Sequence, residues 1–381
     1  MGSTPRRFFI YLALCITLAA LLPVYIWLTG AGHGLFSKTT VYRGFPLLKK
    51  TGMGSNFVSL MQRLDSGQKA YRIPEMTSCV PRRHIVFFRV SKCSSTTLYM
   101  LLQRAVVKYR LRVLRPKTNK IHFYRVHPYR PTKITVHDAK YNPKLTYDVL
   151  MDHMIYDADV INKMMPSDSF HLAILREPFA QFISAYDYFR LWVKFRVHSA
   201  EFLNHPHFYW NRSVSSRDKA TYARNSMISE LGFPDEREDL RDNDTFIQSY
   251  INFLDSALDF VIIVELLDEC LVYLRRLLCW TMEDMLYSNA NVQKKYRRPW
   301  REQNNTLYKE KHKRWSKADH QLYQHFLNKF LATLRRQGHD FFEELSIFRK
   351  AKDALDRCGV YMMFYIMWFF LLRLGKPFCE G

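Results

Sequence analysis

A run of consecutive apolar residues followed by a helical pattern recurs along this chain and constrains its fold more than any other feature. The runs lie at residues 84–90, 171–176 and 260–265, and the last two precede amphipathic helices that extend to Phe189 and over Leu267–Trp280. Continuous apolar character is typical of strands buried on both faces. Strands that alternate with helices favour a parallel sheet flanked by helices, with ligands at the carboxyl ends of the strands. We therefore expect an α/β fold.

Size and charge narrow the class of protein. The 381 residues are 48% hydrophobic, which suffices for one large α/β core or two smaller ones. A formal net charge of +22 favours an anionic partner, such as a nucleotide, a nucleic acid, an acidic glycan or a membrane headgroup. Basic runs at residues 294–298 and 309–314 are typical of solvated surface.

The amino-terminal region predicts a membrane anchor. Residues 8–28 are uncharged and apolar, and at about 1.5 Å per residue they match a bilayer core of about 30 Å. A cleaved signal peptide is the alternative, but its apolar region is about 7–15 residues long. Arg6 and Arg7 predict a cytosolic amino terminus and a lumenal remainder, which is type II topology. This lumenal location argues against nucleic-acid binding, which would need exposure to the cytosol or the nucleus.

Sequons and cysteines agree with a lumenal location. We expect glycosylation at Asn211, Asn243 and Asn304, each of which begins an Asn-X-Ser/Thr triplet. Six of the seven cysteines follow the anchor, in a compartment that permits disulfides, but their pairing cannot be read from the sequence. Their spacing does not indicate zinc, and we expect no metal.

We expect five segments along the chain. These are a cytosolic tail (1–7), the anchor (8–28), a lumenal stem (29–80), the main folded domain (81–357) and an apolar carboxyl-terminal segment (358–381). The uncharged run at residues 358–372 would make a helix only about 22 Å long, so a buried or membrane-surface helix and a short second span both remain open.

A hydroxyl-rich turn with a lysine joins the first predicted strand to a helix. We call this turn the lysine loop, and its residues are Ser91, Lys92, Cys93, Ser94, Ser95, Thr96 and Thr97. Free N–H groups and the positive dipole end at a helix start can cradle a phosphate, and Lys92 adds a mobile charge. The alternative is a simple Ser/Thr helix cap beside a solvated lysine, because the glycines of a Walker loop are missing.

A second segment carries an arginine at a strand end and a serine on the helix that follows. Arg176 and Ser184 are eight residues apart and could reach one phosphate from the same side. The alternative is a strand-end salt bridge with a buried helical serine.

These segments together resemble the galactose-3-O-sulfotransferases, a family of carbohydrate sulfotransferases. The similarity covers residues 81–87, the lysine loop, 152–154, 175–189, 222–225, 231–233, 277–280 and 283–284. The resemblance implies a sulfotransferase fold related to P-loop nucleotide kinases and NTPases. It also implies a Golgi membrane enzyme that uses 3′-phosphoadenylyl sulfate to sulfate the 3-hydroxyl of a β-galactosyl residue on a glycolipid or glycan.

The resemblance also implies roles for particular residues. Arg176 and Ser184 would hold the 3′-phosphate of the donor, and His153 matches a histidine that the family uses, so it is our candidate for the base. The 5′-phosphosulfate would be held by Lys92, Cys93, Ser94, Ser95, Thr96 and Thr97. Lys92 at the bridging oxygen would neutralise charge on the leaving phosphate.

The chain departs from the family pattern at one position. Ser91 stands where the family has a histidine, and Arg89 replaces a lysine. Three explanations follow: His153 suffices, another residue such as His84 or Glu265 substitutes, or activity is weak. Other classes also stay open. They are a uronyl 2-O-sulfotransferase-like enzyme, a membrane-anchored glycan-binding relative, and a P-loop kinase, which would need glycines and acidic metal ligands.

Overall fold

The computed structural model describes residues 79–117, 135–213, 221–235, 237–288 and 305–358. Within them lies a four-stranded sheet in the order β2-β1-β3-β4, in which every neighbouring pair is parallel. Its strands are β1 (Ile85–Phe88), β2 (Val149–Leu150), β3 (Phe170–Leu175) and β4 (Phe260–Ile263). The predicted parallel sheet is confirmed.

The three predicted strands are present. Strands β1 and β4 are shorter than their apolar runs, whereas β3 begins and ends one residue earlier than its run. Ile85, Val86 and Phe87 in β1 are 0% exposed, as expected for a strand covered on both faces. The ladder ends before Arg89, before Arg176 and at Ile263, where the chain turns away from the sheet. Strand β2 was not predicted, because two residues are too few to show a pattern.

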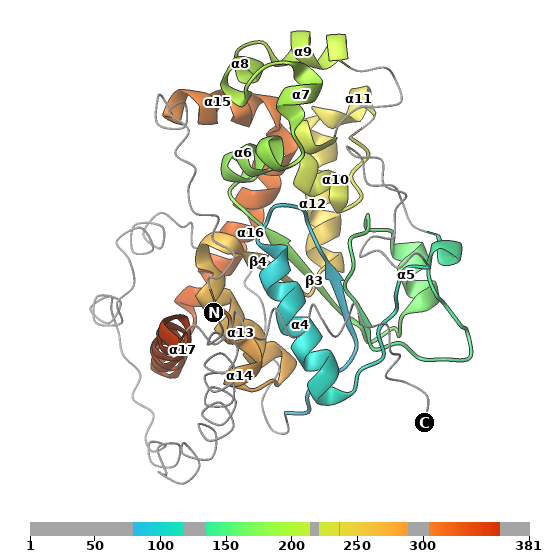
Figure 1. Ribbon diagram of the computed structural model, residues 1–381, viewed down its shortest axis with the longest axis vertical. Helices are drawn as coiled ribbons and strands as arrows, with labels where there is room; N and C mark the ends of the chain where they lie inside the picture. The colour runs from blue at the N-terminus through green and yellow to red at the C-terminus, as the bar shows by residue number, and fades with distance from the viewer. Residues whose placement is uncertain (1–78, 118–134, 214–220, 236, 289–304, 359–381) are drawn as a thin grey trace, which may run out of the picture. The chain divides into compact units, whose positions relative to one another are not determined.

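Helices flank the sheet (Figure 1). Helix α13 begins at Leu267 as predicted and ends at Leu278, two residues early, and it contacts β4, as does α16. The helices of the sheet region are α4 (Ser95–Tyr109), α5 (Ala158–Met164), α6 (Pro178–Tyr188), α12 (Asp244–Ala257), α13 (Leu267–Leu278), α14 (Met282–Met285) and α16 (Lys317–Arg335). The others are α7 (Leu191–Phe195), α8 (Ser199–Asn204), α9 (Pro206–Ser213), α10 (Ser226–Glu230), α11 (Glu238–Arg241), α15 (Asn305–Trp315) and α17 (His339–Cys358).

An aromatic cluster anchors α6. Phe182 and Tyr186, both 1% exposed, pack with Phe202 of α8 and with residues around Trp315 at the end of α15. The hydroxyl of Tyr186 donates a 2.8 Å hydrogen bond to the carbonyl oxygen of Val197. This packing holds the helix that follows Arg176 in place.

The chain divides into two compact units. The larger one comprises residues 46–287 and 293–349, and it contains the sheet and every residue of the candidate site. The smaller one comprises residues 1–45, 288–292 and 350–381, of which only 288 and 350–358 are described, the latter forming the last part of α17.

Several expectations lie outside the described residues. They include the predicted anchor at 8–28, most of the stem, the apolar run after residue 358 and the sequon at Asn304. Of the helices that the structure describes, none combines the length and apolar character needed to cross a bilayer. Asn211 and Asn243 are both exposed, and their glycosylation stays a prediction.

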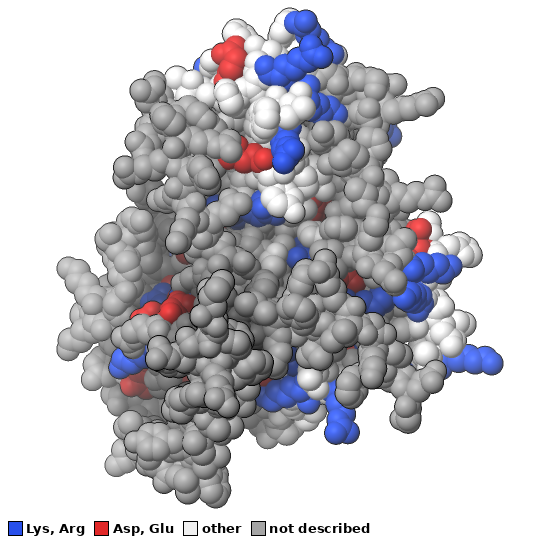
Figure 2. Space-filling view, viewed as in Figure 1, with Lys and Arg blue, Asp and Glu red and all other residues white. Residues whose placement is uncertain are grey.

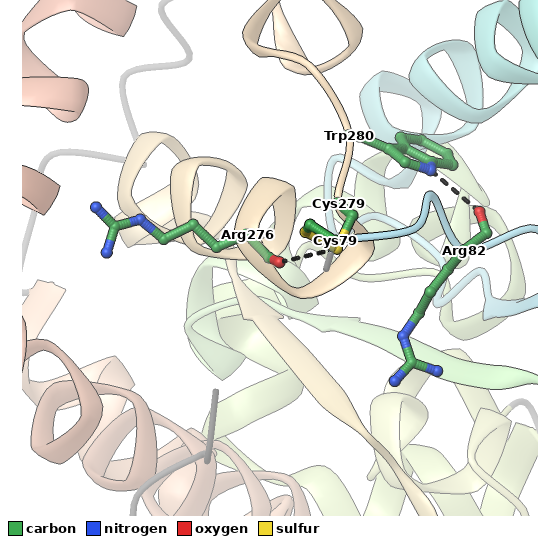
Figure 3. The surroundings of a disulfide bond; sticks show 5 residues. All are labelled: Cys79, Arg82, Arg276, Cys279 and Trp280. Atoms are coloured by element: carbon green, nitrogen blue, oxygen red, sulfur yellow. Dashed lines mark hydrogen bonds between the residues drawn. A yellow bond between two sulfur atoms is a disulfide. The ribbon is translucent and has the colours of Figure 1, made fainter. Parts of the chain in front are cut away.

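One disulfide joins Cys79 to Cys279, 200 residues apart (Figure 3). Next to it, the backbone N–H of Arg82 donates to the carbonyl of Leu278 at 2.9 Å. The indole N–H of Trp280 donates to the carbonyl of Arg82 at 3.1 Å. The chain is therefore tied to the end of α13 just before it enters β1.

Candidate functional site

The lysine loop turns sharply at the carboxyl end of β1. Lys92 and Ser94 have φ angles of 61° and 53°, in the left-handed region, whereas Cys93 between them does not. Non-glycine residues seldom adopt this conformation. Alternation of this kind lets successive backbone N–H groups converge into a concavity suited to an anion.

The amino terminus of α4 is open toward this loop, unlike that of α6. Ser94 stands at the N-cap of α4, and its side chain makes no capping hydrogen bond there. In α6 the carboxylate of Glu177 accepts from the N–H groups of Phe179 and Ala180, at 3.4 and 2.8 Å. The N–H groups of Ser95 and Thr96 are therefore the ones suited to bind an external anion, whereas the N–H of Thr97 donates to the carbonyl of Ser94 at 3.0 Å.

The loop residues differ in what they can offer to a ligand. Ser94 and Thr96 are exposed, and Thr97 is half-buried. Ser95 is 5% exposed and Cys93 is 0% exposed, so their side chains are buried in the protein. A ligand could contact these two residues only through their backbone N–H groups. Thr96 also accepts a 3.2 Å hydrogen bond from the guanidinium of Arg89.

Arg176, which follows β3, contacts the lysine loop. Its Nη1 donates to the carbonyl oxygen of Lys92 at 3.2 Å. The Nζ atom of Lys92 lies 3.8 Å from the ring centroid of Tyr188, at the end of α6. Burial, and then the charge of Arg176, lower the pKa of Lys92. Ser184 lies half-buried within α6, and its predicted contact with a 3′-phosphate stays a prediction.

His153 follows β2, at the carboxyl end of the parallel strands, where the lysine loop follows β1. It comes three residues after Leu150, the last residue of β2, and β2 pairs with β1, which leads into the lysine loop. The preceding Asp152 is 0% exposed and accepts from Arg115 at 3.4 Å. Burial raises the pKa of Asp152, although Arg115 opposes this shift. The half-buried His153 therefore directly follows a buried carboxyl that an ion pair with the partly exposed Arg115 anchors.

The two alternative bases are engaged elsewhere. His84 immediately precedes β1, at the opposite end of that strand from Lys92, and its Nδ1 lies 2.7 Å from Asp168. Both carboxylate oxygens of Glu265 accept hydrogen bonds, from the N–H of Glu177 and from the hydroxyl of Tyr323. His153 stays our candidate for the base.

Sequence reasoning missed the side chains that support the loop. The N–H of Ser91 donates to Glu230 at 2.7 Å, and its carbonyl accepts from Gln181 at 3.0 Å. Nothing in the local pattern around Glu230 or Gln181 signals this contact. Tyr188 lay within the family-like segment, but its proximity to Lys92 was not foreseen.

The described surface includes many cations. Figure 2 shows Lys and Arg side chains spread over several parts of one face. Lys309, Lys313 and Arg314 of α15 are exposed, which confirms that this part of the basic run is solvated. Among the described residues we find no group of three His, Cys, Asp or Glu side chains that could hold a metal ion.

Comparisons with known proteins agree on one family. Residues 38–361 match the family model described as galactose-3-O-sulfotransferase. Galactosylceramide sulfotransferase from Bos taurus is 29% identical over 286 residues, which cover 73% of this chain and 64% of that protein. Galactose-3-O-sulfotransferase 2 from Sus scrofa is 29% identical over 262 residues, covering 68% of this chain and 63% of that protein.

A third relative is aligned over more of its length. Galactose-3-O-sulfotransferase 3 from Mus musculus is 28% identical over 326 residues, covering 80% of this chain and 72% of that protein. The chain therefore spans just under two thirds of the length of the bovine and porcine relatives. No solved structure matches it.

Proposed function

The chain belongs to the galactose-3-O-sulfotransferase family, and on this premise we propose that it sulfates the 3-hydroxyl of a β-galactosyl residue on a glycolipid or glycan. The sulfuryl donor is 3′-phosphoadenylyl sulfate, which the family implies. One observation carries the proposal: Arg176 donates to the carbonyl of Lys92, in the loop that leads into the start of α4, where the N-cap side chain makes no capping hydrogen bond. Two cationic residues therefore lie close to a helix start suited to an anion.

The residues of this region fit the two phosphate ends of the donor. The N–H groups at the start of α4, with the hydroxyls of Ser94 and Thr96, bind the 5′-phosphosulfate. Arg176 and Ser184 bind the 3′-phosphate. A guanidinium suits this role because it can donate two parallel hydrogen bonds to a phosphate.

Lys92 assists departure of the leaving phosphate. As the acceptor oxygen forms its bond to sulfur, the bond between sulfur and the bridging oxygen breaks, and negative charge grows on the phosphate. The Nζ atom of Lys92 neutralises that charge. To reach the bridging oxygen, the ammonium leaves its contact with the Tyr188 ring.

His153 accepts the proton of the attacking hydroxyl. A sugar hydroxyl has a pKa far above neutrality and is a weak nucleophile until a base removes its proton. The position of His153 after β2, next to the anchored Asp152, supports this role.

Tyr188 marks the side from which the acceptor approaches. The residue is 64% exposed, although its ring contacts the Nζ atom of Lys92. Its neighbour Phe189 stacks on Tyr222 with ring centroids 3.7 Å apart, which steadies the end of α6. The apolar face of a galactose ring can pack on an exposed aromatic ring placed in this way.

A Golgi membrane location with type II topology is also part of the proposal. The Cys79–Cys279 disulfide supports an oxidising compartment, and the apolar run at 8–28 supports a membrane anchor. The exposed Asn211 and Asn243 are accessible to glycosylation.

Transfer of labelled sulfate tests the proposal. The purified full chain is incubated with ³⁵S-labelled donor and with galactosylceramide, a β-galactosyl glycan or a uronic-acid polymer. Label on the 3-hydroxyl of galactose supports the proposed reaction. Label on the uronic-acid polymer alone would indicate a uronyl 2-O-sulfotransferase, and acceptor binding without transfer would indicate a glycan-binding relative.

A further inference from the structure

The peptide group of Ser91 is held on both sides by side chains from later helices. Its N–H donates to Oε2 of Glu230 in α10 at 2.7 Å, and its carbonyl accepts from Nε2 of Gln181 in α6 at 3.0 Å. Gln181 in turn accepts from the hydroxyl of Ser226 at 3.0 Å. Since Ser91 directly precedes the left-handed Lys92, these contacts set the direction in which the loop leaves β1.

The carboxyl group of Glu230 is enclosed in the protein. Glu230 is 4% exposed, Ser91 5% and Gln181 1%. Oε1 of Glu230 is buried and has no hydrogen-bond partner among the described residues. Burial raises the pKa of Glu230 to about 8, the hydrogen bonds from Ser91 oppose the shift, and the nearby Asp319 adds to it.

Other titratable groups surround this carboxyl. Burial raises the pKa of the Cys93 thiol well above its usual value, so the thiol is neutral and Glu230 does not face a thiolate. Burial also raises the pKa of Asp319 to about 7. Asp319 in α16 interacts electrostatically with Glu230. The Cys93 thiol interacts with Glu230, with Arg176 after β3, with Glu265 after β4 and with Asp319.

We infer that Glu230 is a positioning residue of the donor site, which holds the lysine loop through the Ser91 N–H and takes up a proton when the donor binds. This inference rests on the proposed function, because it assigns the anion beside Lys92 to the phosphosulfate of the donor. The proton comes from the buffer and is carried by Oε1, while Oε2 keeps its hydrogen bond to Ser91.

The physical reason is repulsion between like charges in a buried environment. Glu230 accepts a hydrogen bond from Ser91, the residue just before Lys92, and Lys92 meets the phosphosulfate. A bound anion therefore disfavours the charged form of Glu230. Donor affinity therefore falls as pH rises through the range in which the free protein loses this proton. By linkage, the affinity for the donor falls about fivefold or more between pH 7 and pH 9.

Calorimetry on the full chain in detergent micelles tests the inference, with adenosine 3′,5′-bisphosphate as the probe. Titrations at pH 8 in buffers of different ionisation enthalpy measure the protons taken up for each molecule bound. We expect a substantial fraction of one proton in the native chain, and a clear decrease in Glu230→Gln, whose amide keeps an acceptor for the Ser91 N–H. Glu310→Gln, an exposed change on α15, is the matched control and retains the uptake.

Glu230→Ala supplies the second variant, because it removes the acceptor altogether. It should weaken binding about tenfold at pH 7, since the buried Ser91 N–H loses its partner. The difference from the native chain should narrow toward pH 9, because the carboxyl that takes up the proton is gone. Equal proton uptake in the native chain and in Glu230→Gln would overturn the inference. Absence of proton uptake in the native chain would also overturn it, and this measurement does not depend on whether the variants fold. Failure of the native chain to bind the probe would instead refute the proposed function, and the inference with it.

Discussion

The guanidinium of Arg176 donates a 3.2 Å hydrogen bond to the carbonyl oxygen of Lys92, 84 residues earlier in the chain. This contact brings the end of β3 against the loop after β1. It also leaves the other guanidinium N–H groups available for a phosphate.

Replacing Arg176 should weaken donor binding. Arg176→Ala removes charge-assisted hydrogen bonds worth about 1.5–3 kcal/mol, so the affinity for adenosine 3′,5′-bisphosphate should fall about 10- to 100-fold. Arg176→Lys should recover part of this loss, because the charge returns without the planar fork. Arg314→Ala, an exposed change on α15, is the control. Unchanged calorimetric affinity in Arg176→Ala would show that this residue does not contact the donor.

Lys92→Ala should impair catalysis more than binding. Removal of one group that stabilises transition-state charge lowers kcat by about 100- to 1,000-fold. Loss of donor affinity should be smaller, because the N–H groups of α4 remain. Pre-steady-state transfer of labelled sulfate and calorimetric binding separate the two effects, and a variant with native kcat would refute the assigned role.

His153→Ala should lower kcat by about 100- to 10,000-fold, since a general base contributes on that order. The affinity for adenosine 3′,5′-bisphosphate should stay close to native, because His153 lies after β2 and outside the lysine loop. His137→Ala is the control, an exposed histidine on a short 3-10 helix. If His153→Ala transfers sulfate at the native rate, another residue is the base.

Reduction of the Cys79–Cys279 disulfide should destabilise the protein. The bond closes a segment of 200 residues, and loss of a native disulfide typically costs about 2–4 kcal/mol. Urea unfolding of the full chain with and without reductant measures the effect. A Cys79→Ser, Cys279→Ser double variant should match the reduced protein and should not respond to reductant.

The stability of the fold should depend on the ionisation of Asp319. This buried carboxylate accepts from the N–H groups of Met227 and Ile228, at the start of α10, and burial raises its pKa to about 7. The folded state then binds more protons than the unfolded state between about pH 4 and pH 7, so this contribution to the free energy of unfolding falls as pH rises through that range.

Asp319→Asn should flatten that pH dependence, because an amide cannot ionise. Chemical unfolding of the native chain and the variant at several pH values from 5 to 8 checks this. The same slope in both proteins would show that Asp319 does not carry the effect.

Local sequence determined three of the four described strands and the starts of α6 and α13. Strands β1, β3 and β4 could be predicted because each is an unbroken apolar run, and α6 because Pro178 opens an amphipathic pattern. Lys92 could be singled out because a hydroxyl-rich turn before a helix is a local feature. The family resemblance then supplied the roles that we propose for Arg176, Ser184 and His153.

Tertiary structure alone decided how the loop is supported. Ser91 and Glu230 are 139 residues apart, and Cys79 and Cys279 are 200 residues apart, so no periodic pattern links either pair. The two-residue β2 exists because it pairs with β1, and its own composition does not specify it. A pattern reports what one segment buries, whereas contacts such as these depend on which segments the folded sheet brings to the same edge.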